Sequence, residues 1–77
     1  MERKEIENKV LKLIEDQIGE AVTDTKADLK EDYKIDSIAT LDFIMSVEDE
    51  FGIQFDDDEL ENMNTVDDVI NRIEQLV

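Results

Sequence analysis

The stretch Asp36-Ser-Ile-Ala-Thr-Leu-Asp-Phe-Ile-Met-Ser-Val-Glu-Asp-Glu-Phe-Gly52 carries the clearest helix signal in the 77-residue chain. It has no proline and no internal glycine, so nothing interrupts a helix between its two ends. Asp36 is a favoured N-cap residue, and Gly52 suits the left-handed conformation that ends many helices. We therefore predict a helix over residues 37–51, with Ser37 at its first position.

A helix over residues 37–51 has two apolar faces. At about 100° per residue, one sector holds Phe43, Ile44, Val47 and Phe51. An arc of about 60° facing largely the other way holds Ile38, Leu41 and Met45. A chain of this length can hardly bury both faces.

Two interpretations of the second stripe are open from the residues alone. Its residues could pack under the preceding loop, where Leu29 and Tyr33 need apolar neighbours. They could instead form a docking face for a partner, because the stripe is flanked by carboxylates at Asp42, Glu48 and Asp49. The carboxylates by themselves fit an ordinary solvated helix face equally well.

The rest of the chain adds three helices and one long loop. Apolar residues at helical spacing predict a helix over about 2–18, ended by Gly19, and a last helix that Thr65 caps. Asp56 and Glu59 resemble a capping box for a short helix ending near residue 62. Residues 20–36 form a long loop pinned by scattered apolar side chains. The prediction is an all-α fold with three longer helices and one short one, in a single domain over residues 1–77.

Composition excludes several functions. The net charge of −15, from 8 basic and 23 acidic side chains, repels nucleic acids and anionic membranes and favours partners with basic patches. No run reaches the ~18 apolar residues of a membrane span, and the N-terminus leads into an amphipathic segment rather than a signal-peptide core, so we expect a cytoplasmic protein. We also expect a monomer. Without cysteine or histidine, the usual zinc ligands and the usual neutral-pH base are missing.

Acidic residues 56–61 invite a calcium-loop interpretation. Asp56 and Asp58 have the spacing that opens such a loop, but Leu60 falls on a ligand position and Glu61 stands where the turn glycine belongs. Helix capping is the preferred explanation, and we expect no metal site.

The stretch 36–51 closely resembles the modification site and second helix of acyl carrier proteins, which read Asp-Ser-Leu followed by an acidic and apolar helix. The resemblance continues through Gly52-Ile53-Gln54-Phe55, the acidic short helix and Thr65-Val66-Asp67-Asp68-Val69. It implies a four-helix bundle that carries acyl groups as thioesters on a 4'-phosphopantetheine arm. The resemblance places this arm on Ser37, next to Asp36, and implies that a phosphopantetheinyl transferase attaches it from coenzyme A.

The same resemblance assigns roles to both faces of the helix. It makes Ile38, Leu41, Asp42, Met45, Glu48 and Asp49 the contacts for the basic surfaces of transferring and acyl-chain-synthesising enzymes. It makes Phe43, Ile44, Val47 and Phe51 the lining of a cavity that shelters the acyl chain. This division matches the two sectors found from helical geometry and favours the docking interpretation of the stripe.

Three residues depart from the family pattern. Lys34 stands where glycine is usual, Ala39 where an acidic residue often follows, and Ile38 where leucine is more common. These departures suggest a specialised pathway rather than housekeeping fatty acid synthesis, and the pathways open to a carrier include fatty acid, polyketide and related biosynthesis.

Two rival functions stay open. An aminoacyl or peptidyl carrier would use the same arm, and a non-enzymatic acidic adaptor would bind a basic protein without any arm. An enzyme is disfavoured, because a serine nucleophile needs a base within hydrogen-bond reach and the nearby candidate bases are carboxylates on an exposed helix end.

Overall fold

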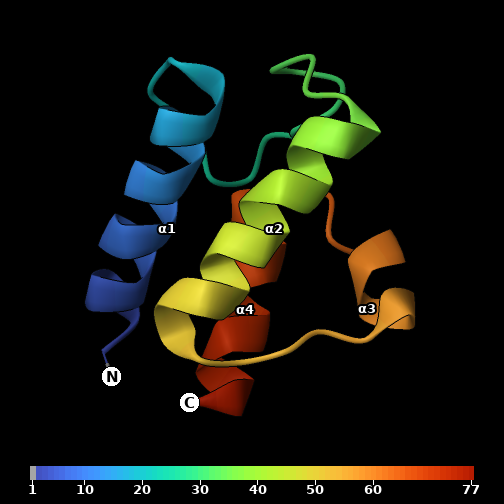
Figure 1. The fold of residues 1–77 in the computed structure, drawn as a ribbon. Helices are drawn as coiled ribbons and strands as arrows, with labels where there is room; N and C mark the ends of the chain where they lie inside the picture. The colour runs from blue at the N-terminus through green and yellow to red at the C-terminus, as the bar shows by residue number, and fades with distance from the viewer. Residues whose placement is uncertain (1) are drawn as a thin grey trace.

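Four helices make up the computed structural model, which describes residues 2–77 (Figure 1). They are α1 (Arg3–Ile18), α2 (Ser37–Phe51), α3 (Asp57–Glu61) and α4 (Val66–Leu76). Within residues 2–77 the only β-type pairing is a single bridge between Asp28 and Thr65. The all-α prediction with three longer helices and one short one is confirmed. None of the helices in this part of the chain is long and apolar enough to cross a membrane.

The helix ends follow the capping residues seen in the sequence. Gly19 and Gly52 adopt left-handed φ angles of 78° and 65°, which a side chain would oppose. The Ala39 N–H donates to Asp36 Oδ1 at 2.7 Å. At the start of α4, the Asp68 N–H donates to Thr65 Oγ1 at 3.1 Å, and Asp68 Oδ2 accepts from the Thr65 N–H at 3.2 Å. Each cap satisfies backbone groups that the helix itself cannot pair.

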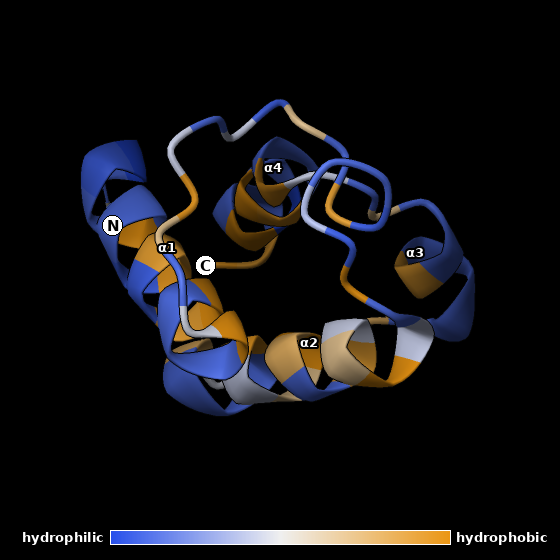
Figure 2. Cartoon of the chain, turned by 90° about the horizontal axis from the view of Figure 1, so that it is seen from above, coloured by the Kyte–Doolittle hydropathy of each residue, from blue (hydrophilic) through white to orange (hydrophobic). Residues whose placement is uncertain are grey.

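The core lies between α1, α2 and α4, whose apolar faces turn toward one another (Figure 2). The fully buried side chains include one aromatic residue, Phe43 of α2, and a set of aliphatic residues from all three helices. The aliphatic members are Ile6, Val10, Ile14, Val47, Val66, Val69, Ile70 and Ile73. The apolar face of α2 that contains Phe43 therefore belongs to the core.

The long loop between α1 and α2 is fixed to the start of α4. Val22, Leu29 and Ile35 are buried, as the scattered apolar residues predicted. The Leu29 N–H donates to the Asn64 carbonyl at 2.8 Å, and the Asp67 N–H donates to the Thr25 carbonyl at 2.9 Å. The loop therefore holds the residues before α2 in one place.

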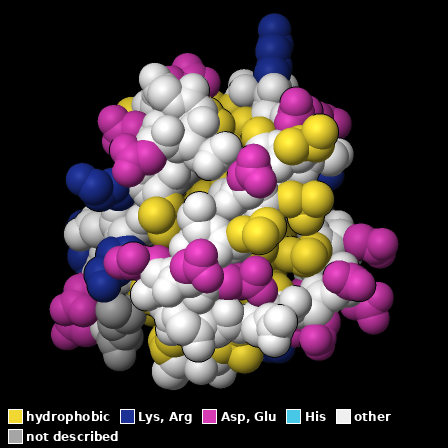
Figure 3. Space-filling view, viewed as in Figure 1, with side chains coloured by type: hydrophobic (Ala, Val, Ile, Leu, Met, Phe, Trp, Pro, Cys, Tyr) yellow, Lys and Arg dark blue, Asp and Glu magenta, His cyan; other side chains and the backbone are white. Residues whose placement is uncertain are grey.

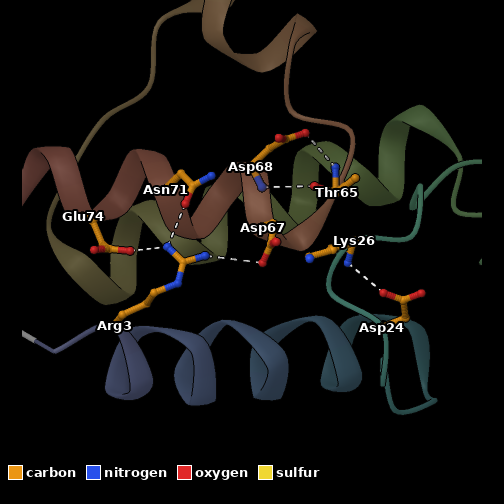
Figure 4. A network of polar contacts seen from close by, with 8 residues as sticks. All are labelled: Arg3, Asp24, Lys26, Thr65, Asp67, Asp68, Asn71 and Glu74. Atoms are coloured by element: carbon orange, nitrogen blue, oxygen red, sulfur yellow. Dashed lines mark hydrogen bonds and ion pairs between the residues drawn. The ribbon is translucent and has the colours of Figure 1, made fainter.

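Ion pairs join the helices at the surface. Arg3 at the start of α1 reaches three residues of α4: Asp67 at 3.4 Å, Glu74, and Asn71 through a hydrogen bond of 2.7 Å (Figure 4). Arg72 of α4 pairs with Glu59 and so fastens the five-residue α3 to the bundle. Exposed ion pairs such as those of Arg3 are worth about 0.2–1 kcal/mol each, so the apolar core provides most of the stability.

Lys34 holds a left-handed backbone conformation with φ of 56°, which glycine adopts without a penalty. In the folded state, this conformation strains an L-residue by roughly 1–2 kcal/mol. Glycine avoids the strain, but its greater freedom in the unfolded chain lowers the free energy of unfolding by about 0.4–1 kcal/mol. We therefore expect Lys34→Gly to raise the free energy of unfolding by about 0.5–1 kcal/mol in urea denaturation. Lys30→Gly is the control, because Lys30 has no positive φ and should lose stability. Equal losses in both variants would contradict the role of backbone strain.

Candidate modification and docking site

Ser37 is exposed at the first position of α2, where Asp36 fixes the start of the helix. The Asp36 carboxylate accepts the Ala39 N–H. The backbone carbonyl of Asp36 accepts the Thr40 N–H at 3.0 Å and the Thr40 hydroxyl at 2.9 Å. Asp36 therefore caps the N-terminus of α2 with both its side chain and its backbone carbonyl. Ser37 therefore lies at the surface, on the first residue of a capped helix.

The electrostatics at Ser37 suit a phosphodiester. The N-terminus of α2 carries the positive end of the helix dipole, which is favourable for negative charge. The side chain is exposed, so a group on its oxygen meets no packed neighbour. The residues at this position therefore fit a covalently attached phosphopantetheine.

The stripe of Ile38, Leu41 and Met45 faces solvent. Their exposed fractions are 73%, 48% and 60%, whereas Leu29 is buried in the core. The interpretation that the stripe packs under the loop is therefore wrong. Figure 3 shows hydrophobic side chains gathered over α2 with acidic side chains around them. We call Ile38, Leu41 and Met45 the apolar stripe.

The three predicted acidic contacts are placed differently. Asp42 and Asp49 are exposed on α2. Glu48 is half-buried, and its Oε2 accepts the Phe55 N–H at 2.8 Å. Glu48 therefore fixes the α2–α3 connection to α2. No pattern in the sequence indicated this role, because the contact forms only when the chain turns at Gly52 and brings Phe55 back to Glu48.

The predicted cavity residues are packed together in the core. Phe43, Ile44 and Val47 are buried, and Phe51 is half-buried with the Lys9 ammonium 5.8 Å from its ring centre. Two surface depressions, of about 310 and 150 Å³, lie between α3 and α4 and between α1 and the end of α2. Neither is lined by these four residues. Sheltering an acyl chain among them would require the packed helices to separate.

The acidic stretch 56–61 forms a helix start. Glu59 Oε2 accepts the Asp56 N–H at 3.3 Å, which is one arm of the predicted capping box. In residues 2–77 no group of three or more carboxylates is arranged to hold a metal ion. The Asp56 carbonyl accepts the Leu60 N–H at 3.1 Å, so Asp56 stands at the start of α3.

Comparison with known proteins agrees with this geometry. Residues 8–73 match the family model of the phosphopantetheine attachment site. An acyl carrier protein of Rickettsia bellii is 38% identical over 72 residues, covering 91% of this chain and 89% of that protein. The chain belongs to the acyl carrier protein family. An acyl carrier protein of Thermotoga maritima is 37% identical over 75 residues, covering 95% of this chain and 93% of the relative.

The fold agrees as well. The solved structure of an acyl carrier protein from Enterococcus faecalis matches with a TM-score of 0.81 and 30% identity, covering 97% of this chain and 98% of that one. Members of the acyl carrier protein family are carriers rather than enzymes, and they bear a covalently attached 4'-phosphopantetheine.

Proposed function

We propose that Ser37 bears the phosphopantetheine arm and that the protein delivers acyl thioesters to enzymes of fatty acid, polyketide or related biosynthesis. The observation that carries this proposal is the exposed hydroxyl of Ser37 at the N-terminus of α2, directly followed by the exposed apolar stripe. A partner that reaches the stripe also reaches the arm.

The chain itself contributes position and surface rather than chemistry. Ser37 Oγ forms the new bond to phosphorus, coenzyme A releases its nucleotide part, and the transferase takes the hydroxyl proton. When attached, the arm supplies a thiol that holds the acyl group as a thioester. The helix start keeps the attachment point fixed, and the tether gives partner enzymes a high local concentration of substrate.

The apolar stripe is the proposed contact for the transferase and for acyl-transferring enzymes, with Asp42, Glu48 and Asp49 facing their basic patches. Glu48 contributes mainly by holding the connection after α2, because its carboxylate is already bonded to the Phe55 N–H. The charges speed encounter, and the apolar contacts slow dissociation.

Ile38 is the most exposed apolar side chain of the stripe. We expect Ile38→Asn to lower kcat/KM of the transferase by about 10–30-fold, because a central apolar contact is worth about 2 kcal/mol. Leu76→Asn is the control, since Leu76 is exposed near the far end of the chain. Transferase kinetics at fixed salt measure both. If Ile38→Asn and the original sequence reacted at equal rates, the apolar stripe would not be part of the docking site.

We further propose that the acyl chain shelters among Phe43, Ile44, Val47 and Phe51. Phe43, Ile44 and Val47 are buried inside the bundle and Phe51 is half-buried at its edge. The chain has no cysteine, so packing and not a disulfide holds the helices together. A protein that binds a chain only in its folded state gains stability from it.

The test uses the purified protein with coenzyme A and a broad-specificity phosphopantetheinyl transferase. The carrier function predicts an intact mass increased by one phosphopantetheine. When acyl-coenzyme A replaces coenzyme A in the reaction, the added mass should also include the acyl group, and hydroxylamine should release that group from its thioester. An acidic adaptor would keep its mass. Mass spectrometry of the protein from its native cells distinguishes acyl from aminoacyl or peptidyl cargo.

A further inference from the structure

Lys34 is the basic residue nearest to Ser37 in the sequence, and no other Lys or Arg occurs between residues 31 and 71. The neighbourhood is otherwise acidic, with Asp36 before the serine and Asp42 on the following helix. Ion pairs within residues 2–77 use Arg3, Lys9 and Arg72 as cations, so the Lys34 ammonium is held by no carboxylate there. It is the one positive charge close to the attachment point along the chain.

The backbone fixes Lys34 at a short distance from Ser37. Two residues, Ile35 and Asp36, separate Lys34 from Ser37. Ile35 is buried, and its N–H donates to the Leu29 carbonyl at 3.1 Å. Asp36 is extended, with φ −79° and ψ 175°, and its carboxylate is used by the Ala39 N–H. Three residues span at most about 10 Å, and lysine adds a flexible four-carbon stem. An anion on Ser37 Oγ therefore lies within reach of the ammonium.

The conformation at Lys34 is one that glycine would adopt without strain, yet the chain has an exposed lysine there. Strained residues of this kind gather at functional sites, where the surrounding structure holds them in place. Packing does not explain the choice, because the Lys34 side chain is exposed.

Resting on the proposed attachment of the arm to Ser37, we propose that the Lys34 ammonium is the counter-ion of the arm's phosphodiester and holds the first part of the arm beside the loop 19–36. Two unit charges about 6 Å apart in water attract enough to favour the paired arrangement by about threefold. Lys34 touches no reacting atom and is a positioning residue.

The test is phosphorus NMR relaxation of the phosphodiester in the modified protein, after its mass confirms the arm. In Lys34→Gln the phosphate should be more mobile, so we expect its transverse relaxation to be slower than in the original sequence. Lys34→Arg restores the charge and should restore the rate. Lys4→Gln is the matched control and should change nothing, because Lys4 is exposed at the start of α1, at the opposite end of the bundle from the start of α2 (Figure 1). Raising salt from about 0.01 to 1 M shortens the Debye length from about 30 to 3 Å. The original sequence should then approach Lys34→Gln, which itself stays nearly constant.

The outcomes separate this proposal from the carrier function. A modified protein whose phosphate relaxes identically with lysine and glutamine at position 34 would overturn the role of Lys34 and leave the arm on Ser37 in place. A protein that gains no arm would overturn both.

Discussion

Ser37→Ala is expected to gain no mass from coenzyme A and the transferase under conditions in which the original sequence is converted completely. The substitution removes the oxygen that would bond to phosphorus. It leaves the start of α2 intact, because Asp36 provides the cap and the Ser37 hydroxyl makes none of its hydrogen bonds. The measurement is intact mass over a time course, with circular dichroism to show that the helices are retained.

Ser46→Ala is the matched control for this loss. Ser37 and Ser46 are the only serines in the chain, and both lie on α2. Ser46 is half-buried, and its hydroxyl donates to the Asp42 carbonyl at 3.1 Å within the helix. This variant should be modified at the rate of the original sequence. If Ser37→Ala gained the arm as well, another hydroxyl would be the acceptor and the proposed site would be wrong.

Phe43→Ala is expected to lower the free energy of unfolding by about 3–5 kcal/mol, which is a large part of the total stability of a chain of this length. Phe43 is fully buried among α1, α2 and α4, and phenylalanine-to-alanine changes in cores cost about 3–5 kcal/mol. A chain of this length has a total stability of only about 4–12 kcal/mol at ~0.05–0.15 kcal/mol per residue. Urea denaturation followed by helical circular dichroism gives the difference.

Met45→Ala is the matched control for Phe43→Ala, because it lies two positions along the same helix on the apolar stripe. An exposed substitution of this kind should change the free energy of unfolding by no more than about 0.5 kcal/mol. Comparable losses at positions 43 and 45 would mean that the stripe is also part of a core, contrary to its exposure.

The helices could be predicted from the sequence because their signals are local. Asp36, Gly52 and Gly19 each act within one turn of the helix they begin or end. Two apolar sectors on α2 followed from periodicity alone, and only the structure decided between packing under the loop and exposure for the stripe containing Ile38. That choice depends on where the loop runs, which is a tertiary property.

Features set by distant or irregular contacts were not predictable. The left-handed conformation of Lys34 has no local sequence signal, since lysine rarely adopts it. The bond from the Phe55 N–H to Glu48 and the reach of Arg3 to α4 depend on the final packing. Ser37 itself resembles an ordinary helix-start residue, so its proposed role came from the family resemblance rather than from physical chemistry.

The central claim is that the Ser37 oxygen carries the arm, and fragment mass spectrometry of the modified protein tests it most directly. Peptide fragmentation should place one phosphopantetheine on the residue between Asp36 and Ile38 and leave every other hydroxyl unmodified. A fully folded protein that carries the group at Ser46 or at a threonine, or that carries none after complete reaction, would contradict the claim.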